Sequence, residues 1–447
     1  MNFFDQLVIP PSSEQSLLLN LIQIISFTIF YPFTGMILGG TLLSLYFRSK
    51  AKKTGNNLYM KFSNDIIKYL AISRNAGFGL GILPVISITI VYAQFLYSSN
   101  IISVGVLFLS VLMFIISYTF IYRYKSSAET DSVISEIKNA GVDDKKLTED
   151  VVSFEENIKT EVSSSGNSGL WLLILSVFLF IGGTTIASNM NYWADAKTVF
   201  SVFINTSVWL NFIYFFVTSL AISGGAILFF FFSWQGGIKI ENNEYKDLVL
   251  KHSVNIALFF SLLQPLFLFL SFLILPTESY SSSVFIFAGL AFISILFVCN
   301  FLYAIIRNSD VKFAGWVFAV MLLTFMFVSA KNQYAFSNAI KPHTLVVNAK
   351  ADEKLKEMMP KKEAAEVSGE DIYKSRCAAC HKFDTKLVGP PYQETLPKYG
   401  DDVKKLAGFI YNPVKVNPEY PAMPNQGLKM KEAEAVAKYL LEKYKNK

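Results

Sequence analysis

Eight long apolar runs constrain the fold of this 447-residue chain more than any other feature. Each run reaches about 17 residues or more, the length that a helix needs to cross the hydrocarbon core of a bilayer. Inside lipid the backbone must satisfy its own hydrogen bonds, so these runs are expected to be helices. The eight expected spans are Leu17–Phe47, Asn75–Tyr97, Ile101–Ile121, Leu170–Ala187, Val208–Trp234, Ser253–Leu275, Val284–Ile306 and Ala314–Ala330.

Positive charge is distributed unevenly between the connections that join these spans. The odd-numbered connections carry eighteen Lys or Arg residues, whereas the even-numbered ones carry only Lys197. Basic residues collect on the cytoplasmic side of membrane proteins. We therefore expect a multi-pass protein of a bacterial cytoplasmic membrane, with both termini on the periplasmic side.

The composition changes near Ala330. The whole chain is 52% hydrophobic and only 17% charged, whereas soluble domains carry about 25% charged residues. The charge that exists is concentrated after the last apolar run. This predicts a transmembrane helical domain over residues 1–330, a periplasmic linker over 331–368 and a small periplasmic domain over 369–447. The linker could be a flexible tether or could pack against the membrane part.

The segment Cys377-Ala378-Ala379-Cys380-His381 is the strongest chemical signal in the chain. This spacing is the attachment signature of a c-type haem: the two sulfur atoms bond to the porphyrin and the histidine becomes the proximal iron ligand. A zinc site would need two more Cys or His nearby, and the sequence has none there. A redox dithiol would leave the adjacent histidine without a role.

The last 80 or so residues, from Gly369 onward, resemble a class I monohaem cytochrome c. The first helix of that family matches Ser368–Cys377, and the segment Val388-Gly389-Pro390 resembles the Gly-Pro stretch beside the proximal histidine. Residues Lys431–Tyr444 would form the C-terminal helix, whose apolar stripe crosses the first helix. The stripe consists of Val436, Tyr439 and Leu440.

This resemblance implies one covalently bound haem c, held by Cys377 and Cys380 with His381 and Met423 as the iron ligands. Met423 lies in Tyr420-Pro421-Ala422-Met423-Pro424, which matches the family's distal-ligand loop. Met430 is the alternative, but it lacks flanking prolines. A Met/His pair leaves no open position for a substrate, so the iron would pass single electrons.

A weak internal repeat relates Gly39-Gly40 in the first span to Gly224-Gly225 in the fifth. It predicts two four-helix bundles, an arrangement that resembles the large subunit of the cytochrome bd quinol oxidases. The chain departs from that family, which binds haem through membrane histidines. Its other histidines, His252 and His343, are expected on opposite sides of the membrane and cannot share one iron; a mixed His252–Met site stays open.

Polar residues in the spans could mark a quinone site. The candidates are Arg74, Asn75, Gln94, Asn255 and Gln264. The alternative is that these side chains only bond neighbouring helices or reach the membrane surface. A quinone is thus the second cofactor that the sequence leaves open.

Together these features predict an all-α protein that transfers single electrons at the periplasmic face, as a subunit of a respiratory complex. The expected partners are membrane lipid, other subunits of the complex and a redox protein, with no nucleic acid. Residues 371–447 carry fourteen basic and nine acidic residues, which suits an acidic redox partner, lipid head groups or plain solubility. Alternatives are a quinol-oxidising subunit related to the bd oxidases, in which case the chain is itself part of an enzyme, and a redox sensor.

Overall fold

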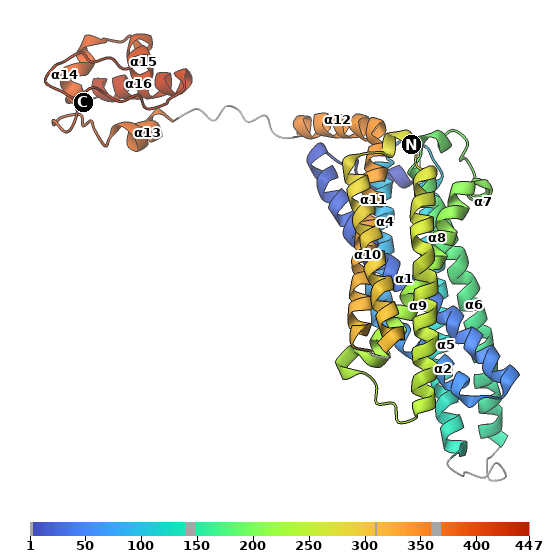
Figure 1. Ribbon diagram of the computed structural model, residues 1–447. Helices are drawn as coiled ribbons and strands as arrows, with labels where there is room; N and C mark the ends of the chain where they lie inside the picture. The colour runs from blue at the N-terminus through green and yellow to red at the C-terminus, as the bar shows by residue number, and fades with distance from the viewer. Residues whose placement is uncertain (1–2, 140–148, 309–310, 359–367, 447) are drawn as a thin grey trace. The chain divides into compact units, whose positions relative to one another are not determined.

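The computed structural model describes residues 3–139, 149–308, 311–358 and 368–446 (Figure 1). The chain divides into two compact units. We call Met1–Asp352 the N-terminal unit and Glu353–Lys447 the C-terminal unit. All regular structure in the described ranges is helical, as the all-α prediction requires.

The N-terminal unit contains eight helices that are long and apolar enough to cross a membrane, which confirms the predicted number. One of these spans is made of three consecutive elements, Arg74–Phe95. The spans are α1 (Ser13–Thr54), α3 (Arg74–Ala76) with η2 (Gly77–Ile82) and α4 (Leu83–Phe95), α5 (Ser103–Asn139), α6 (Glu149–Ala187), α8 (Thr206–Phe232), α9 (Asn243–Leu273), α10 (Ser282–Asn308) and α11 (Ala314–Ala339).

Helix α1 occupies the middle of the bundle and packs against α2, α4, α6, α8 and α11. Its glycines make the approach to α8 possible. A Cβ on Gly39 would lie 2.3 Å from Ser223 Oγ and 2.6 Å from the carbonyl oxygen of Ser219, distances that no side chain tolerates. The glycine pair in the first span therefore serves close helix packing.

Helical structure in two of the connections was not predicted. Helix α2 (Asn57–Leu70) buries Phe62, Ile66 and Leu70 on one face, a helical spacing within the basic loop after α1. The mixed-charge connection after the third span is also helical where the structure describes it, because α5 and α6 continue past their apolar parts. Residues 140–148 of that connection lie outside the described ranges.

The predicted boundary at residue 330 lies inside α11, which runs on to Ala339. Most of the expected linker is helical as well, because α12 spans Lys341–Met358. The Asp352 carboxylate accepts hydrogen bonds from the Ser13 amide and hydroxyl, at 3.2 and 2.6 Å, at the start of α1. The first part of the linker is therefore packed against the bundle; its residues 359–367 lie outside the described ranges.

The C-terminal unit is a small helical domain with its own apolar core. The first and last helices of this unit cross, as predicted. They lie so close together that a Cβ on Gly369 would lie 2.1 Å from the carbonyl oxygen of Ala435. Val436 and Leu440 of the last helix are fully buried in the core. The elements are α13 (Gly369–Ile372), η8 (Tyr373–Cys377), α14 (Tyr392–Thr395), η9 (Leu396–Lys398), α15 (Val403–Tyr411) and α16 (Met430–Lys445).

Candidate haem site and membrane cavity

The Cys-Ala-Ala-Cys-His segment forms a tight turn at the end of the first helix of the C-terminal unit. Ser368 caps that helix, since its hydroxyl accepts a hydrogen bond from the Asp371 amide at 3.2 Å. At the other end the amides of Cys380 and His381 both donate to the carbonyl oxygen of Cys377, at 3.1 and 3.0 Å. The turn brings both thiols and the imidazole close together, with Cys377 buried and Cys380 half-buried.

The His381 ring is fixed by the segment that follows the turn. Its Nδ1 lies 3.0 Å from the carbonyl oxygen of Pro390, to which it can donate a hydrogen bond. That bond leaves Nε2 as the free electron-pair donor. Residue 389 must be glycine here, because a Cβ would lie 2.3 Å from His381 Cε1. The predicted role of the Gly389-Pro390 pair beside the histidine agrees with this geometry.

Met423 and His381 line one cavity in the C-terminal unit, about 190 Å³ in volume. Cys377 lies in its wall, together with apolar side chains such as Leu406 and Ile410. Met430, the alternative sixth ligand, is 44% exposed and is not part of this wall. An imidazole nitrogen, a thioether, a thiol and an apolar lining suit a haem, so the residues present fit a haem c.

Aromatic side chains pack against this turn. The ring of Tyr392 stacks on His381 with a centroid separation of 5.1 Å and packs against Phe383 at 5.2 Å. Burial raises the pKa of the Tyr392 hydroxyl and also that of the Cys377 thiol. A reactive dithiol needs a lowered thiol pKa, so this environment does not favour the redox-dithiol alternative.

The remaining histidines lie at opposite ends of the bundle, as predicted. The His252 ring is surrounded by Phe47, Tyr59 and Phe62, with centroids at 5.0, 5.9 and 6.4 Å. His343 belongs to α12 and packs edge-on against Trp193 at 5.1 Å. Within the described ranges, no group of three or more His, Cys, Asp or Glu side chains could hold a metal ion.

The five polar candidates for a quinone site do not come together. Arg74, Asn75 and Asn255 are exposed and lie outside any shared site. Gln94 is half-buried and donates to the carbonyl oxygen of Ile9 at 3.4 Å. Only Gln264 lines an internal cavity of the N-terminal unit, and no other candidate does.

Sequence reasoning missed the charged residue of that cavity. Lys331 is 2% exposed and lies in its wall. It stands directly after Ala330, where the last apolar run was expected to end. The signal that could have found it is the continuation of apolar residues beyond it, at Tyr334 and Phe336.

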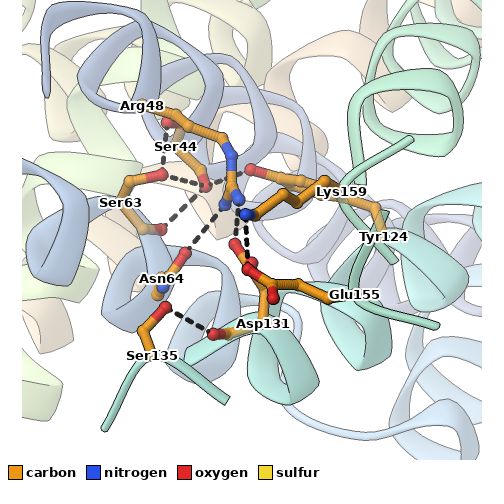
Figure 2. A network of polar contacts seen from close by, with 9 residues as sticks. All are labelled: Ser44, Arg48, Ser63, Asn64, Tyr124, Asp131, Ser135, Glu155 and Lys159. Carbon is orange, nitrogen blue, oxygen red and sulfur yellow. Dashed lines mark hydrogen bonds and ion pairs between the residues drawn. The ribbon is translucent and has the colours of Figure 1, made fainter. Parts of the chain in front are cut away.

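A second polar cluster joins α1, α2, α5 and α6 at the end of the bundle where α1 stops (Figure 2). Arg48 forms a buried ion pair with Asp131, and its other amino group donates to Asn64 Oδ1 at 3.0 Å. Nearby, the Ser44 hydroxyl lies 2.7 Å from the Tyr124 hydroxyl. Arg48 therefore stabilises the packing of these helices. It was counted among the basic residues of the first connection, but it is buried.

Comparison with known proteins bears on the C-terminal unit. Residues 364–440 match the family described as cytochrome C oxidase, cbb3-type, subunit III. Cytochrome c-551 of Pseudomonas denitrificans is 33% identical over 78 residues, which is 17% of this chain and 95% of that protein. Cytochrome c-551 of Azotobacter vinelandii is 48% identical over 33 residues, which is 7% of this chain and 40% of that protein. No solved structure gives a significant match. The CxxCH turn, the glycine beside the histidine and this similarity agree, and the chain belongs, through its C-terminal unit, to the cytochrome c family.

Proposed function

We propose that this protein is a membrane-bound cytochrome that transfers single electrons as a subunit of a respiratory electron-transfer complex. The observation that carries the proposal is the cavity in which His381, Met423 and Cys377 meet. A cytochrome c domain implies haem c, and eight apolar helices imply attachment to a membrane. The role in a respiratory complex is our extension of these two features.

In this proposal Cys377 and Cys380 hold one haem covalently, and His381 and Met423 are the two iron ligands. The hydrogen bond between His381 and Pro390 orients the imidazole and leaves Nε2 for the metal. Met423 would be the second protein ligand, and a Met/His pair would leave no position on the iron for a substrate. The bound haem supplies a one-electron iron couple, and the apolar wall keeps water from it.

The distribution of Lys and Arg supports an orientation with the C-terminal unit in the periplasm of a bacterium. Labelling with a membrane-impermeant maleimide tests this. In a Cys299→Ser background, Lys350→Cys should react in intact cells and Lys52→Cys should not. The reverse labelling pattern would contradict the orientation.

The electron partner in this proposal is an acidic protein. Lys398 and Lys415 are among the residues that line the cavity of the C-terminal unit, and basic residues outnumber acidic ones in residues 371–447. Charged surfaces of this kind guide weak, salt-sensitive docking. The N-terminal unit binds lipid and the other subunits.

A second candidate function is quinol oxidation by the chain itself, which the resemblance to the bd oxidases suggested. One observation favours it: a partly polar cavity with a buried lysine exists inside the membrane-spanning bundle.

Replacement of Met423 tests the proposed haem ligation. We expect Met423→Leu to keep covalent haem but to lower its reduction potential, by a fraction of the roughly 0.8 V range over which axial ligands tune haem iron. The charge-transfer absorption of Met-ligated ferric haem should disappear. Met430→Leu is the matched control and should change neither the reduction potential nor this absorption. If Met430→Leu alone abolished that absorption, the ligand assignment would be wrong.

A further inference from the structure

The N-terminal unit contains a cavity of about 150 Å³ between α1, α4, α6, α8, α9, α10 and α11. Its wall changes character along the bundle. Residues from the ends of α6 and α11, such as Ser188, Asn189 and Asn332, make one part polar. Residues deeper in the bundle, such as Ile222 and Val298, make the other part apolar. Buried polar and ionisable residues within membrane-spanning helices are rare and often mark a ligand or ion pathway.

Lys331 is the only charged residue in the wall among the residues that the structure describes. Its Nζ donates a hydrogen bond to Ser271 Oγ at 2.8 Å and lies 5.1 Å from the centroid of the Phe272 ring. An ammonium group has three N–H donors, so these contacts leave it able to bind another acceptor. The described wall contains no Asp or Glu that could accept from Lys331. We therefore expect the acceptor to come from a ligand that carries oxygen atoms.

Two buried polar atoms in the same wall have no hydrogen-bond partner. They are Oε1 of Gln333 and Oγ of Ser261, in side chains that are 2% and 1% exposed. The amide nitrogen of Gln333 is already used, because it donates to Asn20 Oδ1 at 2.7 Å. Buried polar atoms are almost always paired, so Gln333 Oε1 retains the capacity to accept one hydrogen bond.

The size and the lining of the cavity restrict the class of ligand that it can bind. An apolar cavity of about 150 Å³ in another protein accommodates benzene, so this one has room for a single six-membered ring. The rings of Tyr31, Tyr92 and Phe215 are part of its wall and suit a flat, conjugated group. The ligand is therefore a single ring with oxygen substituents that dissolves in lipid.

We propose that this cavity binds the head group of a quinone or quinol, with Lys331 donating to a ring oxygen. The carbonyl form accepts hydrogen bonds from Lys331, and the hydroxyl form can donate to Gln333 Oε1. The inference rests on the proposed electron-transfer function, which calls for an electron donor in the membrane. Binding does not involve the haem, however, so either proposal can fail without the other.

Binding of decylubiquinone to the purified full-length protein in lipid nanodiscs tests the proposal. We expect saturable binding by calorimetry and a rise in the thermal transition of the protein. Lys331→Met should weaken binding at least tenfold, and Gln264→Leu should weaken it several-fold. Lys350→Met removes an exposed lysine of α12 and should bind as the wild type does. Gln94→Leu, which changes a glutamine outside the cavity, should also have no effect.

Decanoate, which has the same chain length and a carboxylate head, distinguishes a quinone site from an anion site. Binding of decylubiquinone but not of decanoate supports the proposal. Equal affinity of wild type and Lys331→Met for decylubiquinone would overturn it, as would tight binding of decanoate alone. Gln264→Leu provides an independent readout if Lys331→Met does not fold.

Discussion

The two cavities of this protein offer opposite chemistry to a bound group. The cavity of the C-terminal unit is lined by the His381 imidazole and the Met423 thioether, which are electron-pair donors and suit a metal. The cavity of the N-terminal unit is lined by the Lys331 ammonium, hydroxyls and amides, which donate hydrogen bonds and suit oxygen. One chain thus contains a cavity suited to a metal in one unit and a cavity suited to an oxygen-bearing ligand in the other.

The two cavities also differ in how their residues are positioned. His381 is held by backbone groups within ten residues, through the turn from Cys377 and the carbonyl of Pro390. Lys331 faces residues that come from six other helices. The first site therefore depends on local geometry, whereas the second depends on the packing of the whole bundle. Substitutions in each unit should show how independent the two sites are.

The largest expected effect follows from removal of both thiols. Cys377→Ala combined with Cys380→Ala leaves no covalent attachment, so acidified acetone should extract all haem from the protein. The N-terminal unit has a separate core, and it should keep its thermal transition and its binding of decylubiquinone. Loss of the N-terminal transition in this variant would show that the two units depend on each other.

The next effect concerns the ion pair of the bundle. Asp131→Asn leaves Arg48 buried without its counter-charge, which costs about 3–5 kcal/mol. The thermal transition of the N-terminal unit in mild detergent should fall, while the haem spectrum stays the same. The double variant Arg48→Met with Asp131→Leu should recover most of the stability, because no charge is left unpaired. A double variant as unstable as Asp131→Asn would refute the role of the ion pair.

A smaller effect is expected at the glycine beside the histidine. Gly389→Ala places a Cβ about where the His381 ring lies, and overpacking of this kind costs about 1–3 kcal/mol. The haem spectrum should change, because the ring must move. Gly408 in α15 is the control, since a Cβ there meets no atom within 4 Å and alanine favours a helix by about 1 kcal/mol. Equal stability of the two variants would contradict the close contact.

The smallest effect is a pH dependence at α12. Burial lowers the pKa of His343 from its usual 6.5, so the folded protein binds this proton less readily than the unfolded chain does. Stability from this group is therefore present above pH 6.5 and declines as the pH falls below it. We expect the thermal transition to drop on acidification by more in the wild type than in His343→Gln. An equal drop in both proteins would exclude His343 as the cause.

The sequence predicts the C-terminal unit in detail because its chemistry depends on short spacings. Cys377, Cys380 and His381 share one turn, and Gly389 follows within the same loop. The eight spans follow from run length alone. The sequence does not show which side of each span packs against its neighbours, since a helix that is apolar all round carries no such signal. Asn255, a candidate for the quinone site, is thus exposed and is not part of the cavity wall.

The parts that sequence reasoning missed depend on neighbours distant in the chain. Lys331 lies at what looks like the end of a run and is buried only because Ser271 and Phe272 of α9 lie against it. In the sequence Arg48 resembles the other basic residues of the first connection, but Asp131 in α5 pairs with it inside the bundle. Usable signals existed for α2, in the helical spacing of Phe62, Ile66 and Leu70, and for Lys331, in the apolar residues that follow it.

The pair between Arg48 and Asp131 also bears on the order in which the bundle assembles. Arg48 is made well before Asp131, and until α5 arrives its guanidinium can stay hydrated at the membrane surface. A shift of α5 along α1 by one helical turn, about 5.4 Å, would separate the two charges and the bonds around them. The pair therefore favours one register of α1 against α5, because only that register brings the two charges together.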